Sequence, residues 1–435
     1  MSVIVSALWM LTTLPLGATD RPPNVVLIIS DDQGWADHGF MGHPVIRTPH
    51  LDRLASESMV FTRVYVPTSL CRPSLASMVT GLYPHQHKIT GNDPKGKVRD
   101  PENRARMVNI FNRSKTVPFF LGEKGYLSHQ SGKWWEGEYK SGGFTHGMTH
   151  GDPTRGGRHG DEGLKIGRET MQPIYDFVEK AGDTPFFLWY APFMPHLPHN
   201  PPERLLNKYL APNRPIAISK YYAMCEWFDE TVGELLSYLD KKGLKENTLV
   251  LYVCDNGWIQ AENPKPGIRT RAKLSPYDAG LRTPVIMRWP GKVKPGRDEK
   301  TLASSLDLVP TILKACGIEP TPDMPGIDLR DRAGLSGRKA IFGSLFTHTA
   351  VDIHSPGANL KYRWGIRGEW KLILPYTPNA DLNLTSAPRA AWVKEHPELY
   401  QVVADPHEKE DLAAKHPGIV QALKQEIDQW WAVSK

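Results

Sequence analysis

The chain is poor in cysteine, with only four in 435 residues. They do not show the paired spacing of a disulfide framework, and no cysteine–histidine spacing typical of a zinc site occurs. We therefore expect neither a disulfide-stapled fold nor a zinc-binding module. The four cysteines are Cys71, Cys225, Cys254 and Cys316.

Strong net charge and long apolar runs are also missing. Lysine and arginine number 53 against 47 for aspartate and glutamate, and no basic run with interleaved aromatic residues occurs. This mild excess suits an anionic substrate but gives no indication of nucleic-acid binding. No apolar run reaches the about 20 residues that a membrane-spanning helix needs, so we expect no stable membrane insertion.

The first 20 residues resemble an export signal. Residues 3–16 are largely apolar and are followed by the small residues Gly17 and Ala18, as before a signal-peptide cleavage site. The basic residues that usually begin such a signal are absent near Met1, which leaves a peripheral N-terminal segment as the alternative. We expect residues 1–20 to be a signal peptide and the mature protein to be periplasmic or extracellular.

Apolar runs alternate with helical patterns over residues 21–335. Continuous apolar runs predict strands that are buried on both faces. The predicted strands are 24–30, 185–190, 248–254 and 284–289, and the predicted helices are 48–58, 219–243 and 304–317. This alternation predicts an α/β domain with a large mixed, mostly parallel sheet flanked by helices.

Residues 336–435 follow a different pattern. Residues 362–376 alternate as in an antiparallel strand pair, with Gly368 near the turn. Residues 416–431 form an amphipathic pattern typical of a closing helix. We expect a small C-terminal α+β subdomain packed on the main domain.

Acidic pairs follow two of the predicted strands. Asp31 and Asp32 come directly after the first strand, and Asp255 and Asn256 come directly after the strand 248–254. The carboxyl ends of strands are where ligands gather in α/β sheets. Such an oxygen-rich cluster suits a hard divalent ion, although capping and turn formation would explain either pair alone.

The stretch TSLCRPSLASMVTG (68–81) holds a cysteine in an unusual position. Free cysteines usually lie in cores as small apolar residues. Cys71 instead lies between a turn and the start of a helix, where a side chain is presented rather than packed. Together with the two acidic pairs, this position favours a functional interpretation of all three stretches.

Several stretches together resemble the type I sulfatases of the alkaline-phosphatase-like superfamily. They occur in the family's order and cover nearly the entire mature chain. They are NVVLIISDDQGWAD, CRPSLASMVTGLYPHQH, SGKWW, FMPHLPH, CDNGW, KLSPYDAGLRTPVIMRWPG, KYRWGIRGEWKLIL and ELYQVVADPHEKEDLA. The ordered set is specific for the family but not for the substrate.

The resemblance implies a chemical role for Cys71. In such sulfatases a formylglycine-generating enzyme oxidises the cysteine of C-x-P-S-R to an aldehyde. One hydroxyl of the aldehyde hydrate, activated by calcium, attacks sulfur and expels the alcohol, and loss of the second hydroxyl's proton then releases sulfate. The implied ligands of the calcium ion, or of magnesium as the alternative ion, are Asp31, Asp32, Asp255, Asn256 and the modified Cys71.

The resemblance also implies roles for three other side chains. Lys133 and Lys273 would bind the sulfate oxygens. His196 would protonate the leaving oxygen, a task that suits an imidazole near neutral pH.

Two positions depart from the family pattern. Leu75 stands where the family has an arginine that helps to hold the diol and is part of the signal read by the converting enzyme. Trp135 stands where the family has the histidine that takes the second proton, and its ring is also a candidate wall for a sugar. Arg72, next to Cys71, is the candidate for the missing positive charge.

A glycine-rich loop, residues 142–163, is the candidate source of the missing histidine. Long loops without regular structure are often functional. We expect His146 or His150 to lie nearest the position that Trp135 vacates. The alternative is a surface loop with incidental histidines.

Three functions are compatible with these residues. The leading hypothesis is hydrolysis of a sulfate ester, expected on a carbohydrate because of export and of the polar loops. A phosphodiesterase or phosphonate monoester hydrolase of the same superfamily is the alternative enzyme. A non-catalytic binder of sulfated glycans is the third, but it would have no need to keep so many cooperating groups.

Overall fold

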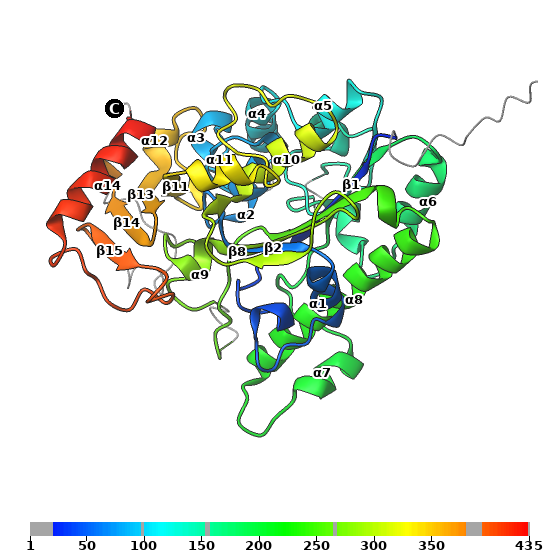
Figure 1. Ribbon diagram of the computed structural model, residues 1–435, viewed down its shortest axis with the longest axis horizontal. Coiled ribbons are helices and arrows are strands. Elements are labelled where there is room, and N and C mark those ends of the chain that lie inside the picture. The colour runs from blue at the N-terminus through cyan, green and yellow to red at the C-terminus, as the bar shows by residue number, and fades with distance from the viewer. Residues whose placement is uncertain (1–20, 97–99, 153–156, 264–267, 380–393, 434–435) are drawn as a thin grey trace, which may run out of the picture.

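A computed structural model describes residues 21–433 except 97–99, 153–156, 264–267 and 380–393 (Figure 1). The strands of its main sheet are β1 (Asn24–Ser30), β2 (Met59–Tyr65), β4 (Leu127–Gly132), β5 (His146–Gly147), β6 (Phe186–Ala191), β7 (Thr248–Cys254), β8 (Arg282–Arg288), β9 (Gly296–Asp298) and β10 (Ala303–Ser304). Their order is β10-β2-β8-β7-β1-β6-β4-β5, and β9 pairs with β2. β1, β4, β5, β6 and β7 run parallel, whereas β8 is antiparallel to β7 and β2. The predicted mixed, mostly parallel sheet is confirmed.

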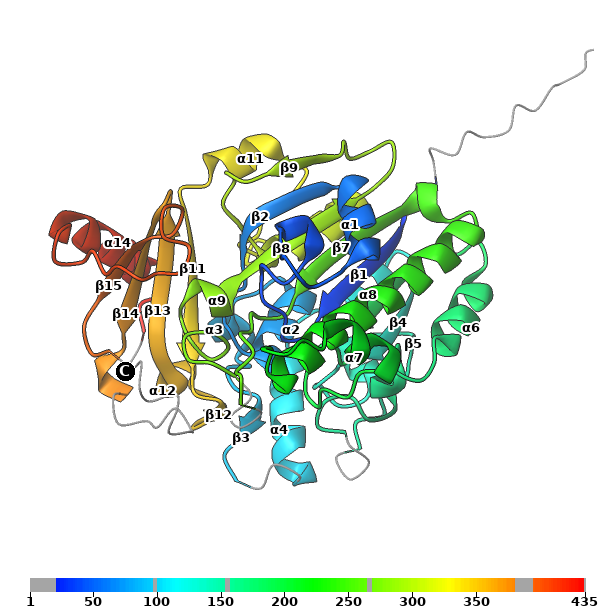
Figure 2. The same ribbon diagram turned by 90° about the horizontal axis from the view of Figure 1, so that it is seen from below.

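Helices cover both faces of this sheet. Those of the main domain are α1 (Pro49–Ser56), α2 (Cys71–Thr80), α3 (Pro84–His87), α4 (Pro101–Phe111), α5 (Val117–Gly122), α6 (Gln172–Ala181), α7 (Glu203–Tyr209), α8 (Ile216–Lys241), α9 (Asp278–Leu281), α10 (Leu308–Ala315) and α11 (Arg332–Gly337). α2, α4, α5 and α10 lie on one side of the sheet, and α1, α6 and α8 lie on the other (Figures 1 and 2).

Alternate residues of β1 enter two separate hydrophobic cores, because successive side chains of a strand point to opposite faces. Val25 and Leu27 pack with α2, α5 and α10, whereas Val26 and Ile28 pack with α1, α6 and α8. Burial on both faces explains why β1 reads as an unbroken apolar run.

The C-terminal part forms a second, antiparallel sheet of β11 (Ala340–Phe346), β13 (Leu360–Arg367), β14 (Trp370–Pro375) and β15 (Glu398–Gln401), in that order. The predicted hairpin is β13–β14, and Gly368 takes the positive φ of its turn, 59°. α12 (Pro356–Asn359) precedes β13, and the predicted closing helix is α14 (Pro417–Trp430), which packs on this sheet (Figure 1). A short pair, β3 (Asp93–Pro94) with β12 (Thr349–Ala350), joins this part to the segment after α3.

Element bounds differ from the sequence prediction mainly at helix starts. The helix predicted from Ser219 begins at Ile216, directly after Pro215. The helix predicted over 304–317 is a 3₁₀ turn, Ser305–Asp307, followed by α10. Within the described residues, no helix is long and apolar enough to cross a membrane.

Candidate active site

The two acidic pairs meet at one edge of the main sheet. β1 and β7 are parallel neighbours in a register that pairs Ser30 with Cys254, so the residues that follow them lie together. The backbone N–H of Asp32 donates to Asp255 Oδ1 at 3.0 Å, and Asn256 Nδ2 donates to Asp32 Oδ1 at 2.7 Å. Asp32 has a positive φ of 60°, which ends the strand in a tight turn.

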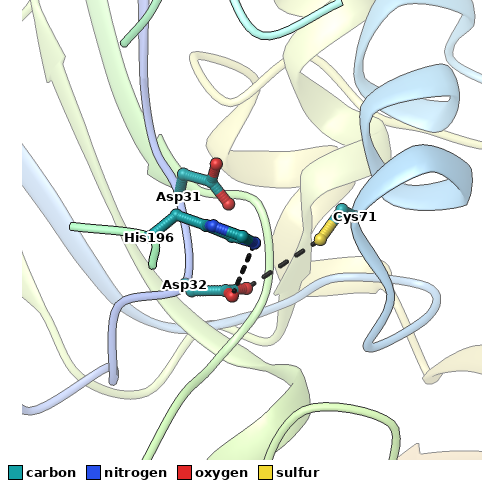
Figure 3. A group of neighbouring side chains, drawn as sticks. All are labelled: Asp31, Asp32, Cys71 and His196. Carbon is teal, nitrogen blue, oxygen red and sulfur yellow. Dashed lines mark hydrogen bonds and ion pairs between the residues drawn. The ribbon is translucent and has the colours of Figure 1, made fainter. Parts of the chain in front are cut away.

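Cys71 faces this cluster from the first residue of α2 (Figure 3). Leu70 is extended before it, and Gly81 ends the helix in a left-handed conformation. Ser74 Oγ donates to the carbonyl oxygen of Asp255 at 2.5 Å, which fixes α2 against the end of β7. The Cys71 sulfur therefore lies 3.9 Å from Asp32 Oδ1.

Two buried lysines neutralise the carboxylates. Lys133 Nζ lies 2.5 Å from Asp31 Oδ1 and 3.3 Å from Asp255 Oδ2. Lys133 follows Gly132, whose φ is 84° and where a Cβ atom would lie 2.0 Å from the carbonyl oxygen of Ala191. Glycine is thus required for the chain to turn the lysine into the site.

Lys273 and His196 approach Asp32 from other segments. Lys273 Nζ lies 2.6 Å from Asp32 Oδ1 and 2.7 Å from the Cys71 sulfur. His196 Nε2 lies 3.4 Å from Asp32 Oδ2, and its Nδ1 lies 2.6 Å from the carbonyl oxygen of Leu197 (Figure 3). The structure thus brings together all the residues that the resemblance implies for calcium and for sulfate.

Burial and charge set the protonation of these groups. Burial raises the pKa of Asp31 and raises that of Asp255 to about 7, against the pull of Lys133. Burial opposes ionisation of Asp32 as well, but Lys273 and His196 hold its pKa well below its usual range. Burial raises the pKa of the Cys71 thiol to about 12, so the unmodified cysteine is a neutral thiol at pH 7.

Burial also lowers the pKa of His196 to about 3, despite the nearby Asp32 carboxylate. The imidazole is therefore neutral at pH 7 in the protein without substrate. To protonate a leaving group, this ring would first have to take up a proton when the negatively charged substrate binds.

The oxygen atoms of the cluster fit a hard cation. Asp31 Oδ2 and Asn256 Oδ1 are buried and have no hydrogen-bond partner. One ligand atom each from Asp31, Asp32, Cys71 and His196 lies within 4.8 Å of the others. Unpartnered carboxylate and amide oxygens at a shared edge are the donor set that calcium or magnesium takes.

The structure corrects the expected role of Arg72. Its side chain is 1% exposed and forms two hydrogen bonds to Glu136, of 2.7 and 2.6 Å. Glu136 therefore neutralises the charge that was expected to replace the missing arginine. Leu75 is buried in the apolar core that covers this face of the sheet, so it offers no polar group.

The structure also corrects the expected histidine. His146 lies on β5 against Phe177 of α6, and the exposed His150 is held through its backbone N–H by Asp161. His159 instead packs edge-on against Trp135, with ring centroids 4.6 Å apart, and its centroid is 6.0 Å from that of His196.

Trp135 is only 2% exposed, so it does not provide the expected wall for a sugar. Its ring instead supports His159 and lies 5.1 Å from the guanidinium carbon of Arg158. The sequence could not single out His159, because residues 142–163 show no regular period; the prediction named His146 or His150 of the same loop.

Family models match most of the chain. The model of the sulfatase family matches residues 23–318, and that of the C-terminal part of N-sulphoglucosamine sulphohydrolase matches residues 272–385. The chain belongs to the sulfatase family. The reaction of this family is the hydrolysis of sulfate esters, so the chain is a sulfuric ester hydrolase.

Individual sulfatases are similar over most of their length. N-acetylgalactosamine-6-sulfatase of Rattus norvegicus is 30% identical over 370 residues, covering 75% of this chain and 68% of the relative. Arylsulfatase A of Homo sapiens is 30% identical over 467 residues, covering 94% and 87%. The crystal structure of Ps i-CgsB in complex with k-i-k-neocarrahexaose has a TM-score of 0.74 at 22% identity, covering 95% of this chain and 94% of that chain.

Proposed function

We propose that this sulfatase hydrolyses a sulfate ester of a carbohydrate with a formylglycine nucleophile made from Cys71. The observation that carries the proposal is the position of Cys71 on α2, with its sulfur 2.7 Å from Lys273 Nζ and 3.9 Å from Asp32 Oδ1. A thiol with a pKa raised to about 12 is a poor nucleophile, whereas an aldehyde hydrate at residue 71 would supply a nucleophilic hydroxyl group.

Calcium, with magnesium as the alternative, supplies the activation of the nucleophile when bound. The proposed ligands are Asp31, Asp32, Asp255, Asn256 and the modified residue 71. Lys133 and Lys273 then orient the sulfate oxygens, because both ammonium groups already point into the cluster. His196 protonates the oxygen of the departing alcohol.

A carbohydrate substrate is supported by two kinds of observation. The relatives include enzymes named for N-acetylgalactosamine 6-sulfate, and a structural neighbour was solved with neocarrahexaose. Export of the protein, proposed from residues 1–20, would give it access to such glycans. We also propose that a formylglycine-generating enzyme of the host accepts a site with Leu75 at its end.

The mass of the Cys71 peptide from purified protein tests this function. An aldehyde at residue 71, bound calcium or magnesium, and hydrolysis of sulfate esters are expected together, with the Cys71→Ala variant inactive. An unmodified thiol with hydrolysis of a phosphodiester or phosphonate would overturn the proposal in favour of the alternative enzyme. Binding of sulfated glycans without hydrolysis would overturn it in favour of a binding protein.

A further inference from the structure

Three side chains from distant segments form a polar wall. We use this name for Asp93 of β3, Arg158 of the 142–163 loop and His348, which precedes β12. Arg158 Nε donates to Asp93 Oδ1 at 2.9 Å, and a second nitrogen of the same guanidinium bonds Asp93 Oδ2. His348 Nδ1 lies 4.0 Å from Asp93 Oδ2.

The polar wall is connected to the site from the side of His196. The ring of His159 lies 6.0 Å from the ring of His196, and its Nε2 lies 3.5 Å from Arg158 Nη1. The ring of Trp135 packs against both the His159 ring and the guanidinium of Arg158. A short series of contacts thus leads from the proposed proton donor to the polar wall.

A second series of contacts leads from the side of Cys71. The backbone N–H of Arg72 donates to Asn92 Oδ1 at 3.0 Å. Asn92 Nδ2 in turn lies 3.4 Å from His348 Nε2, and Asn92 precedes Asp93 in the chain. The first series ends at Arg158 and the second at His348, so two members of the polar wall are connected through a few residues to His196 and to Cys71.

The polar wall is buried at its centre and open at its tips. The Asp93 side chain is 1% exposed, whereas those of Arg158 and His348 are 31% and 27% exposed. Asp93 pairs with Thr349 in the β3–β12 ladder, and this pairing fixes the backbone of Asp93 relative to that of His348, which directly precedes Thr349. The donor groups are therefore held in place while they remain accessible from solvent.

We propose that the polar wall binds hydroxyl groups of the sugar ring that carries the sulfate ester and thereby determines which sugar sulfate is hydrolysed. A guanidinium and an imidazole beside a carboxylate offer both donors and acceptors, as a hydroxyl group requires. The charge of Arg158 is compensated by Asp93, so a neutral hydroxyl group fits better than a second anion. This inference rests on the proposed function.

The test compares two kinds of substrate with His348→Ala and Arg158→Gln. The sugars are monosulfated galactose, N-acetylgalactosamine and N-acetylglucosamine, and the reference is 4-nitrophenyl sulfate, which has no sugar hydroxyl group. We expect the ratio of kcat/KM on the best sugar sulfate to kcat/KM on the aryl sulfate to fall about 10- to 100-fold, mainly through KM, because one or two hydrogen bonds are lost. His354→Ala, which removes an exposed imidazole six residues after His348, is the matched control.

An unchanged ratio of the two kcat/KM values, whether or not both values fall, would overturn the inference. A loss that appears only for sugars with a carboxylate or a second sulfate would also overturn it, because the polar wall would then recognise an anion. If the wild-type enzyme hydrolyses neither these sugar sulfates nor 4-nitrophenyl sulfate, the proposed function fails and the inference fails with it. If the enzyme is active and only the ratio stays unchanged in both variants, the inference alone is overturned.

Discussion

Charge balance at single residues explains why this edge of the sheet suits a metal and a sulfate ester together. Three carboxylates, Asp31, Asp32 and Asp255, face two ammonium groups, Lys133 and Lys273, which leaves one net negative charge. A divalent cation would make the site positive by one charge, and a sulfate monoester carries one negative charge. With all three carboxylates ionised, the buried groups would therefore be neutral overall when both are bound, which is favourable where burial penalises charge.

Removal of the imidazole of His196 tests its role as proton donor. We expect His196→Ala to lower turnover of sugar sulfates by about 10²–10⁴-fold, because a sugar alcohol is a poor leaving group without a proton. Activated aryl sulfates should lose far less, because their leaving group needs little help. Steady-state kinetics on both classes measure this difference, and equal losses would remove His196 from the role.

We expect His159 to take the second proton from the diol, because its ring packs against Trp135 and lies 6.0 Å from the ring of His196. Burial holds its pKa far below the ordinary value, so the ring is neutral, as a base must be. We expect His159→Ala to release one equivalent of alcohol rapidly and then to turn over slowly, with sulfate retained on the peptide of residue 71. Rapid-mixing kinetics and the mass of that peptide are the two measurements.

His146→Ala is the matched control for this experiment, because His146 lies on β5 and packs against Phe177 of α6. It should keep the steady turnover of the wild-type enzyme. Normal turnover in His159→Ala, without a sulfated peptide, would mean that water takes the proton.

At the scale of elements, burial decided what the sequence could reveal. β1 and β7 are buried on both faces and read as apolar runs, so their existence and the acidic residues at their ends could be predicted. β4 (Leu127–Gly132) has the sequence LSHQSG, and its polar side chains gave no such signal although they are buried. Its strand pairing, and hence the approach of Lys133, depends on contacts with β6 that no local pattern contains.

The site residues divide in the same way. Those that follow a strand or begin a helix, such as Asp31 and Cys71, could be located by motif and position. His159 and Arg158 depend on how an irregular loop folds back over Trp135, which only the tertiary structure determines. The same limit applies to Arg72, because its partner Glu136 lies 64 residues farther along the chain.

The segment that carries Lys273 is held by the C-terminal subdomain. Arg271 and Leu274, on either side of Lys273, both have positive φ, 64° and 63°. Arg271 Nη2 donates to the carbonyl oxygen of Glu408 at 2.6 Å. Farther on, Lys371 Nζ lies 2.8 Å from both Asp278 Oδ1 and Glu408 Oε1, and all three side chains are buried.

We expect Lys371→Met to destabilise the protein by about 3–5 kcal/mol, because Asp278 and Glu408 would remain buried without their cation. Urea unfolding followed by fluorescence measures this free energy. Lys424→Met removes an exposed partner of Asp428 and should cost less than about 1 kcal/mol. Similar losses in both variants would mean that the buried triad contributes little to holding the subdomain.

At the scale of the whole molecule, the two sheets share one hydrophobic core. Trp364 and Tyr400 of the C-terminal sheet belong to the same cluster of buried side chains as Val25 of β1. The backbone N–H of Ser344 also donates to the carbonyl oxygen of Pro67, shortly before Cys71. One of the matching family models, residues 272–385, likewise spans the predicted boundary at 335.

This shared core predicts that the full-length protein unfolds in a single thermal transition. If the parts predicted as 21–335 and 336–435 were independent, each would melt with its own enthalpy. Loss of the C-terminal sheet would instead uncover the apolar cluster and release the Lys273 segment, so neither part should survive alone. Calorimetry should therefore give a calorimetric enthalpy close to the van't Hoff enthalpy, and activity should vanish in the same temperature range. Two resolved transitions, or activity lost well before the main one, would show that the subdomain detaches first and that its contacts with the Lys273 segment are weaker than their burial indicates.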